Sequence, residues 1–496
     1  MSEEEIIEQR KAKLERLRSA GIEPYPSRSQ RTHSSHEAII IFEEAEARGD
    51  AALAALPPLE VAGRITAMRD MGRATFIDIR DGEGRIQTYY RKNVIGPEAY
   101  QRLQELDLGD FISVKGKLFR TKTAEITVEA ESFTLLTKAL RPPPEKWHGL
   151  QDVETRYRQR YLDLLANAEV RDAFLRRSRI ISAIRRFMEN RGFIEVETPV
   201  LQSTAGGAAA RPFVTYHNAL HRQLYLRVAL ELHLKRLIIG GYDRVFEIGR
   251  VFRNEGVSTK YNPEFTMLES YQAYADYNDV MAMVEELVSS VAQEVLGTRQ
   301  VAYGDTVLDF TPPWPRISLQ EAIKDYTGVD FTAYREAAEL ARAAAAAGVA
   351  VEQHWSRAKL VDELLSQKVE PDLLQPTFVI DYPVELSPLA KCKPEDPRFV
   401  ERFELFIAGR EVANAYSELN DPVEQRARFA AQAAQRGAGD EETEVVDEDF
   451  LVALEHGMPP CGGLGIGIDR LVMALTGQTS IREVILFPAL RQREEQ

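Results

Sequence analysis

The feature that most constrains the fold is a block of short alternating strands between Leu59 and about Leu140. Runs such as LEVAGRIT, ATFIDIR and RIQTYY alternate β-branched or aromatic residues with polar ones, and DGEG between two of the runs is typical of a hairpin turn. Five or so strands in about 80 residues predict a small closed barrel of the OB type.

A proline-rich segment, RPPPEKWHG, follows this block and predicts a stiff linker. A chain of 496 residues is also longer than one core usually supports. The charged, helical N-terminus has no apolar centre or cleavage site, so we do not expect it to be a secretory signal. We therefore predict a helical N-terminal extension at 1–58, the barrel at 59–140, a linker at 141–153 and a larger domain at 154–492.

The larger domain interleaves strands with helices, but without regular βαβ alternation. Residues 170–191 predict an amphipathic helix with an apolar stripe, and Gly192 stands where a C-terminal cap belongs. A strand is predicted at 193–201, over FIEVETPVL, and a helical insertion at 318–372, which is rich in Ala, Glu and Leu. This order favours an α+β fold, with a mostly antiparallel sheet flanked by helices.

Charge and cysteine content bear on partners and compartment. A net charge of −15 argues at first against a nucleic-acid partner, but the acidity is concentrated beyond residue 150, so a basic face on the barrel is not excluded. No apolar run reaches the roughly 18 to 20 residues of a membrane-spanning helix, so no membrane partner is expected. Cys392 and Cys461 lack a C-x-x-C partner, which favours a reducing cytoplasm.

Arg253 lies in the first stretch with chemical content, RVFEIGRVFRNEGVSTKYNPEFTMLESY at 244–271. Two predicted strands flank a polar loop there. A site for a nucleotide triphosphate and a carboxylate needs a fixed bidentate cation, which Arg253 supplies. An ordinary surface hairpin with ion pairs explains the same composition.

A glycine-rich strand, GGLGIG, turns into a predicted helix that Arg470 opens. Glycines at alternate positions strip one face of a sheet of side chains, so a planar ligand or another backbone can approach closely. A bare G-x-G-x-G is weak evidence, and close packing explains it as well as a ligand does.

Glu404, Glu411 and Glu418 recur every seven residues in strands that are otherwise apolar. Carboxylates on a largely buried sheet need cationic partners. A divalent metal and a substrate ammonium are candidates, since oxygen ligands suit magnesium. Ion pairs with nearby arginines are the alternative.

Together these stretches resemble the class II aminoacyl-tRNA synthetases, and specifically the bacterial-type, lysine-specific members of the subgroup with an N-terminal OB domain. FIEVETPVL, with Pro199, is similar to motif 1 of that family, the Arg253 region to motif 2, and GLGIGIDR to motif 3. GGAAARPF at 206–213, LELHLKRL and NAYSELND narrow the resemblance to lysine. The resemblance runs from about Leu59 to Ala489.

The resemblance implies a role for each residue of the ATP site. Arg253 would contact the α-phosphate and the substrate carboxylate, and Glu255 would read the adenine amino group. Phe265 and Arg470 would sandwich the adenine ring, and Arg253 and Arg470 are the expected catalytic residues. Lys260 and Tyr261, also expected to bind ATP, stand where bacterial relatives often have arginine and histidine; the expected Mg²⁺ ligands are Glu404 and Glu411.

A lysine substrate presents an α-ammonium, a carboxylate and an ε-ammonium. Burying the ε-ammonium without a carboxylate would cost several kcal/mol, so the pocket needs an acid at its end. The resemblance implies that Glu418 binds the ε-ammonium, with a hydrogen bond from Tyr271. It implies that the Gly207 backbone and Glu231 bind the α-amino group of the substrate. An aspartate-specific relative would need a cation where Glu418 stands. The other residues expected in the lysine pocket are Arg253, Asn414, Tyr416 and, in support, Glu269.

In the barrel, Phe76 and Gln87 match the anticodon readers of the family, with Arg69 nearby. Single-stranded bases are read by stacking on aromatic rings and by hydrogen bonds to base edges, and OB barrels commonly do this. Taken alone, Phe76 favours an inward core residue, but the resemblance implies the opposite, a ring that is available to a base.

The resemblance implies a ligase that activates L-lysine with ATP to lysyl-adenylate and transfers it to the 3′-hydroxyl of tRNA(Lys). A carboxylate is ionised at pH 7, so alignment and charge neutralisation, rather than a general base, must supply the catalysis. A homodimer formed through motif 1 is also implied. Three alternatives remain: a ligase that attaches lysine to a protein, a degenerate RNA-binding paralogue, and aspartyl or asparaginyl specificity.

Overall fold

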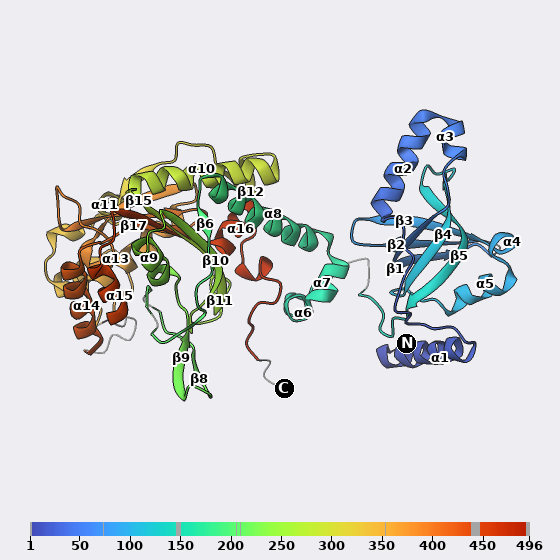
Figure 1. Cartoon of the computed structure of the whole chain (residues 1–496), viewed down its shortest axis with the longest axis horizontal. Coiled ribbons are helices and arrows are strands. Elements are labelled where there is room, and N and C mark those ends of the chain that lie inside the picture. Colours follow the sequence, from blue (N-terminus) through green and yellow to red (C-terminus); the bar gives the residue numbers. More distant parts are fainter. Residues whose placement is uncertain are drawn as a thin grey trace. The chain divides into compact units, whose positions relative to one another are not determined.

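The computed structural model describes residues 2–492, except residues 73, 145–149, 205, 209, 353 and 438–446. The chain divides into two compact units, Met1–Gln151 and Asp152–Gln496 (Figure 1). Most of the segment interpreted as a stiff linker lies outside the described residues. Across the described part of the chain, each helix is too short or too polar to span a lipid bilayer.

The first unit contains the predicted closed barrel, with strands in the order β1–β2–β3–β5–β4. β3 pairs with β5 in parallel, and the other neighbours are antiparallel. The strands are β1 Leu59–Asp70, β2 Ala74–Arg80, β3 Arg85–Arg91, β4 Phe111–Arg120 and β5 Ile126–Thr137. The helices are α1 Glu3–Ser19, α2 Ser35–Arg48, α3 Asp50–Ala54, α4 Lys92–Ile95, α5 Pro97–Arg102 and η1 Leu103–Glu105.

Strand alternation decides which residues fill the barrel. Ile77 and Ile79 of β2 and Ile86 of β3 are at most 1% exposed and belong to one core cluster. Successive side chains point to opposite faces of a strand, so Phe76 and Gln87 lie on the outer face. The inward placement that Phe76 favours when taken alone is therefore wrong.

The second unit is built on an eight-stranded sheet in the order β14–β15–β16–β17–β18–β11–β10–β6. It is antiparallel in the middle, with a parallel pair at each edge. Its strands are β6 Ile194–Glu195, β10 Arg244–Phe252, β11 Glu264–Ala273, β14 Arg316–Ser318, β15 Thr377–Pro383, β16 Phe399–Phe406, β17 Glu411–Ser417 and β18 Cys461–Gly467. Two small sheets hold β7 Leu201–Gln202, β8 Val214–His217 and β9 Arg222–Leu226, and β12 Gln300–Tyr303 and β13 Thr306–Asp309.

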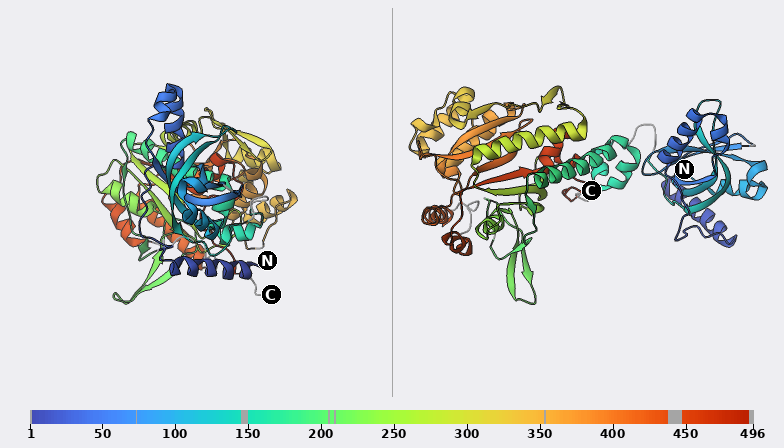
Figure 2. Two further views of the ribbon diagram at one scale, coloured as in Figure 1. Left: turned by 90° about the vertical axis from the view of Figure 1, so that its right-hand side faces the viewer. Right: turned by 45° about the horizontal axis from the view of Figure 1, so that its top comes forward.

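Helices cover both faces of the large sheet (Figure 1 and Figure 2). The helices α8 Ala168–Asn190, α10 Tyr277–Leu296 and α16 Ile468–Thr476 share a core cluster with one face. The helices α9 Glu231–Ile239 and α15 Glu448–Glu455 share a cluster with the other face. The remaining helices are α6 Val153–Arg158, α7 Arg160–Ala166, α14 Pro422–Gly437, η5 Val384–Leu386 and η6 Ile481–Glu483.

A helical segment joins β14 to β15 and forms its own core cluster with them. It contains α11 Leu319–Thr327, η2 Phe331–Ala333, α12 Ala337–Ala346, α13 Arg357–Leu364, the π-helix η3 Leu365–Val369 and η4 Glu370–Asp372.

The strand predicted at 193–201 is wrong in its extent. The structure has two short strands there, β6 and β7, separated by irregular chain. Pro199 has no N–H to donate to a ladder, and the N–H of Thr198 is taken by the Glu247 carboxylate, at 3.0 Å. The preceding helix, α8, begins two residues earlier than the predicted start and ends before Gly192, whose φ is +80°.

Candidate active site

The register of three central strands gathers the predicted site residues on one face of the sheet. Leu464 and Ile466 of β18 pack into the core on the far face, so the alternating glycines face the other way. Glu269 of β11 and Asn414 of β17 both pair with Gly465. Tyr271 and Tyr416 both pair with Gly463. On this face the alternating glycines of β18 therefore carry no side chains beyond the backbone, and polar side chains of β11 and β17 project on either side of them.

A cavity of about 490 Å³ opens over this face. All the residues expected to bind ATP or lysine line it, and of the two expected metal ligands Glu411 lines it and Glu404 does not. The sequence-predicted residues in its wall are Gly207, Glu231, Arg253, Glu255, Lys260, Tyr261, Phe265, Glu269, Tyr271, Glu411, Asn414, Tyr416, Glu418 and Arg470.

Arg253 lies at the end of β10, where the chain leaves the sheet. Its backbone N–H donates to Pro263 O at 2.9 Å, which closes the loop between β10 and β11. Its guanidinium lies 5.2 Å from the Phe265 ring centroid, and burial lowers its pKa. An arginine remains charged at pH 7 even so, which leaves a fixed cation stacked on an aromatic ring at the cavity wall.

Arg470, on α16, lies beside Glu411 rather than over Phe265. Its Nη1 donates to the Glu411 carbonyl at 2.7 Å and to Glu411 Oε2 at 3.2 Å. The cation that contacts the Phe265 ring is therefore Arg253. The expected adenine sandwich needs a gap between Phe265 and Arg470. These two side chains are not in contact in this structure, and Arg470 is paired with Glu411 instead.

Glu404 is held by its own neighbours. Arg402 Nη2 lies 2.5 Å from its Oε1, and the Tyr382 hydroxyl donates to its Oε2 at 2.8 Å. Burial, opposed by Arg402 and assisted by the charge of Glu411, raises the pKa of Glu404 to about 7. Each carboxylate oxygen has two lone pairs, so Glu404 and Glu411 together still offer the oxygen donors that suit a divalent cation.

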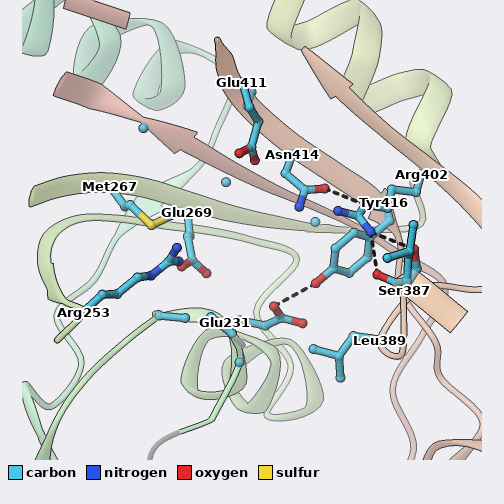
Figure 3. Close-up of a pocket in the computed structure, with 18 of the residues that line it drawn as sticks. Glu231, Arg253, Met267, Glu269, Ser387, Leu389, Arg402, Glu411, Asn414 and Tyr416 are labelled. Carbon is cyan, nitrogen blue, oxygen red and sulfur yellow. Dashed lines mark hydrogen bonds between the residues drawn. The ribbon is translucent and has the colours of Figure 1, made fainter. Parts of the chain in front are cut away.

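Three buried carboxylates, Glu231, Glu269 and Glu418, line the floor of the cavity, and the first two are labelled in Figure 3. Glu269 Oε1 accepts the Leu230 N–H at 2.9 Å, and its Oε2 accepts the Tyr271 hydroxyl at 3.3 Å. Glu231 Oε2 accepts the Tyr416 hydroxyl at 2.8 Å. Glu418 is 1% exposed, and its Oε1 occupies the space above Gly463, where an added Cβ would lie 1.8 Å away.

Burial, and after it the neighbouring negative charge, raises the pKa values of two carboxylates in this floor. Burial, with the charge of Glu231 in second place, raises the pKa of Glu269 to about 8. Burial also raises the pKa of Glu418 well above its ordinary value, against the opposing effect of Lys235. A cation that enters the cavity would favour the ionised carboxylates, so this floor is suited to an ammonium group.

Lys235 and Arg402 are two site residues that the motif reasoning did not single out. Lys235 Nζ contacts both Glu231 and Glu418, and Arg402, which lines the cavity, donates through Nε to Asn414 Oδ1 at 3.1 Å (Figure 3). The i,i+4 spacing of Glu231 and Lys235 within LELHLKRL was an available signal. No comparable signal in the sequence indicated the pairing of Lys235 with Glu418, because these two residues are far apart in the chain.

The predicted anticodon residues lie together on the outer face of the barrel. The Phe76 ring stacks on Tyr89 at 4.5 Å between centroids. Arg69 lies 3.2 Å from Asp78, and Gln87 Oε1 accepts the Thr127 hydroxyl at 3.0 Å. The face therefore offers an aromatic ring and a guanidinium within a small area, which is chemistry that single-stranded bases require, while the Gln87 amide beside them is only 7% exposed.

Comparison with known proteins covers both units. Residues 152–491 match the family model of the tRNA synthetases class II (D, K and N), and residues 59–136 match that of the OB-fold nucleic acid binding domain. A lysine–tRNA ligase of Dehalococcoides mccartyi is 58% identical over 100% of this chain and 99% of its own length. Those of Moorella thermoacetica, 57% identical over 100% and 99%, and Bacillus subtilis, 52% identical over 98% and 97%, are also similar.

Proposed function

The chain belongs to the class II tRNA synthetases for aspartate, lysine and asparagine, and from its full-length similarity to lysine–tRNA ligases within that family we infer that it is a ligase that joins lysine to tRNA. It activates L-lysine with ATP and transfers the lysyl group to the 3′-hydroxyl of the terminal adenosine of tRNA(Lys), releasing pyrophosphate and AMP. The observation that carries the choice of amino acid is the buried acid floor, because an aspartate or asparagine substrate gains nothing from Glu418 and Glu269.

In the first step an oxygen of the lysine carboxylate attacks the α-phosphorus of ATP. The new P–O bond forms as the bond to the β-phosphate breaks, and the electron pair leaves with pyrophosphate. We assign Arg253 to the α-phosphate and the substrate carboxylate, and Lys260 and Arg470 to the remaining phosphate charge. These fixed cations act by alignment and neutralisation, so the step needs no proton acceptor.

Around the adenine we assign Glu255 to the exocyclic amino group and Phe265 to one face of the ring. Tyr261, which is 48% exposed at the mouth of the cavity, would border the nucleotide. Glu404 and Glu411 would hold Mg²⁺, which when bound neutralises charge on the phosphate oxygens. Arg402 and Tyr382 would keep the Glu404 carboxylate oriented toward such an ion.

For the amino acid we assign Glu418 and Tyr271 to the ε-ammonium and the Gly207 backbone and Glu231 to the α-ammonium. Asn414, Tyr416 and Glu269 complete the wall. In the second step the 3′-hydroxyl of tRNA attacks the carbonyl carbon of the adenylate, the bond to AMP breaks, and the hydroxyl proton leaves with the products. We assign anticodon reading to Phe76, Gln87 and Arg69 of the barrel. We also propose that the enzyme acts in the cytoplasm, where it would meet its tRNA substrate.

A homodimer completes the proposal. The irregular segment after α8 and the hairpin of β8 and β9 carry apolar side chains that are about half exposed, as listed here: Ile194 50%, Leu201 47%, Val214 58%, Tyr216 57% and Leu220 55%. An exposed apolar group of this kind is typical of an interface between subunits. This group of exposed apolar side chains lies in and near the segment that resembles motif 1.

Lysine-dependent ATP–pyrophosphate exchange tests the function. The wild-type enzyme should exchange with lysine and not with aspartate or asparagine. Arg253→Ala should lose about a hundredfold to a thousandfold in rate, because it removes a charge contact to the reacting phosphate. Arg250→Ala changes an exposed arginine on β10, the strand that ends just before Arg253; it is the matched control and should retain activity. Exchange with aspartate, or full exchange by Arg253→Ala, contradicts the assignment.

A further inference from the structure

Lys235 is a buried cation that none of the steps above uses. It lies on α9, one turn after Glu231, and its side chain is 0% exposed. Its Nζ lies 2.5 Å from Glu231 Oε1 and also pairs with Glu418 Oε2. The rings of Tyr416 and Phe450 have their centroids 5.6 and 5.8 Å from the same nitrogen. The chain's own lysine thus binds between the two acids assigned to the two ammonium groups of the substrate.

We propose that Lys235 is a positioning residue that determines specificity for a diamino acid, by holding Glu231 and Glu418 in register and setting the net charge of the pocket floor. The proposal rests on the function inferred above. Glu231 and Glu418 come from different elements, a helix and the segment after β17, so no shared backbone fixes their separation. One ammonium between them does so.

The hydrogen-bond pattern shows what Lys235 leaves available. Glu231 uses one oxygen for Lys235 and the other for the Tyr416 hydroxyl. Glu418 Oε2 forms an ion pair with Lys235, whereas Oε1, which is buried over Gly463, has neither an ion-pair nor a hydrogen-bond partner among the described residues. Within the described part of the chain, Lys235 therefore leaves Glu418 Oε1 unpaired in the cavity lining, and the proposed function assigns the substrate ε-ammonium to this carboxylate.

Charge counting leads to the same conclusion. Fully ionised, the three floor carboxylates and Lys235 leave two negative charges, which match the two ammonium groups of free lysine; Arg253 is left for the substrate carboxylate. An amino acid with a neutral side chain would leave one buried charge unmatched. The charged and titratable groups around the floor are Glu231 and Lys235 of α9, Glu269 and Tyr271 of β11, Tyr416 of β17, Glu418 after it, Cys461 of β18 and Arg253 after β10.

The protonation of the floor provides a readout that a merely structural role would not move. Burial raises the pKa of Glu418, and Lys235 opposes that effect. Without the ammonium, Glu418 would bind its proton more tightly and would have to lose it at higher pH before lysine could bind. The acidic limb of the pH profile for lysine should therefore shift upward when Lys235 is neutralised.

The test compares Lys235→Met, of similar length but uncharged, with Lys235→Arg and the wild-type enzyme in ATP–pyrophosphate exchange between about pH 6 and 9.5. For Lys235→Met we expect the KM for lysine to rise about tenfold at neutral pH, which corresponds to one pKa unit. The acidic limb of kcat/KM for lysine should shift up by about one unit, and the KM for ATP should stay within about twofold. Lys235→Arg should recover the pH limb, because it restores the charge.

Arg236→Met is the matched control, because Arg236 follows directly on the same helix, pairs with Asp447 and Asp449, and does not line the cavity. It should leave both the KM for lysine and the pH limb unchanged. If Lys235→Met does not fold, Lys235→Gln replaces it in the same comparison. A folded neutral variant with wild-type lysine KM and pH profile overturns the proposal. Failure of the wild-type enzyme to exchange with lysine would instead overturn the proposed function.

Discussion

Gly463 is the residue at which the sheet and the acid floor meet. Its own strand pairs it with Tyr271 on one side and Tyr416 on the other. The space that a side chain would fill is taken by Glu418 Oε1 and by Tyr271 Cε1, which an added Cβ would approach to 1.8 and 2.7 Å. The alternating glycines in the sequence were consistent with either a ligand or close packing. At Gly463 close packing is the explanation, because the Glu418 carboxylate lies directly against the backbone.

Gly463→Ala should impair lysine binding specifically. The methyl group has to displace Glu418 or Tyr271, and overpacking of this kind costs about 1–3 kcal/mol. We expect the KM for lysine to rise at least about tenfold in pyrophosphate exchange, with a smaller change in the KM for ATP. Thermal unfolding of the same variant separates a local effect from a global one. Equal lysine KM values in the variant and the wild-type enzyme would show that Glu418 does not contact the substrate.

At the level of elements, the hairpin of β8 and β9 projects from the second unit in Figure 1 and Figure 2. Val214 and Tyr216 alternate along β8, so they share one face, and both are more than half exposed. A hairpin with little core of its own is marginal in water, and a second copy of the chain would bury this face.

The double variant Val214→Asp with Tyr216→Asp should convert the proposed dimer into monomers. Two charges in an apolar interface should weaken association by about a hundredfold or more. Sedimentation velocity at micromolar concentration measures the change, and circular dichroism should remain that of the wild-type protein because neither residue is part of the core. Thr215→Asp, on the other face of the strand, is the control. A wild-type protein that sediments as a monomer would exclude the interface.

At the scale of the whole molecule, the proposed roles fall on different units, with base recognition in the first and the chemistry in the second. The cavity and its charged residues belong entirely to the second unit. The aromatic and basic cluster around Phe76 belongs entirely to the first. A change in the barrel should therefore affect the transfer to tRNA and leave the activation of lysine untouched.

Phe76→Ala should lower kcat/KM for tRNA by about tenfold to a hundredfold in aminoacylation, because stacking of one base contributes about 1–3 kcal/mol. Pyrophosphate exchange without tRNA should remain at the wild-type rate. Tyr25→Ala removes an aromatic ring from elsewhere on the first unit, where its hydroxyl donates to Lys138 O, and should leave aminoacylation nearly unchanged. An equal loss in both variants would argue for a general destabilisation of the unit.

Local pattern was enough for the barrel and for the face on which the site lies. Strand alternation depends only on the backbone period of two, so LGIG by itself places its leucine and isoleucine on one side and its glycines on the other. For Phe76 the local pattern was not enough, because only the burial of Ile77 and Ile79 shows which face of β2 points inward. The overlong strand at 193–201 failed because Pro199 and the Glu247 carboxylate act on the backbone there, and only the second of these lies outside the segment.

Only the tertiary structure decided how the charged groups pair. Lys235 with Glu418, Arg470 with Glu411, and Arg253 over Phe265 are contacts between residues on different elements, a few ångströms apart in space. The sequence by itself determined which residue types are available and toward which face of the sheet they point, because periodicity is a property of the local backbone. It did not determine which acid meets which base, because ion pairing depends on separation through space, and that is fixed only when distant elements pack.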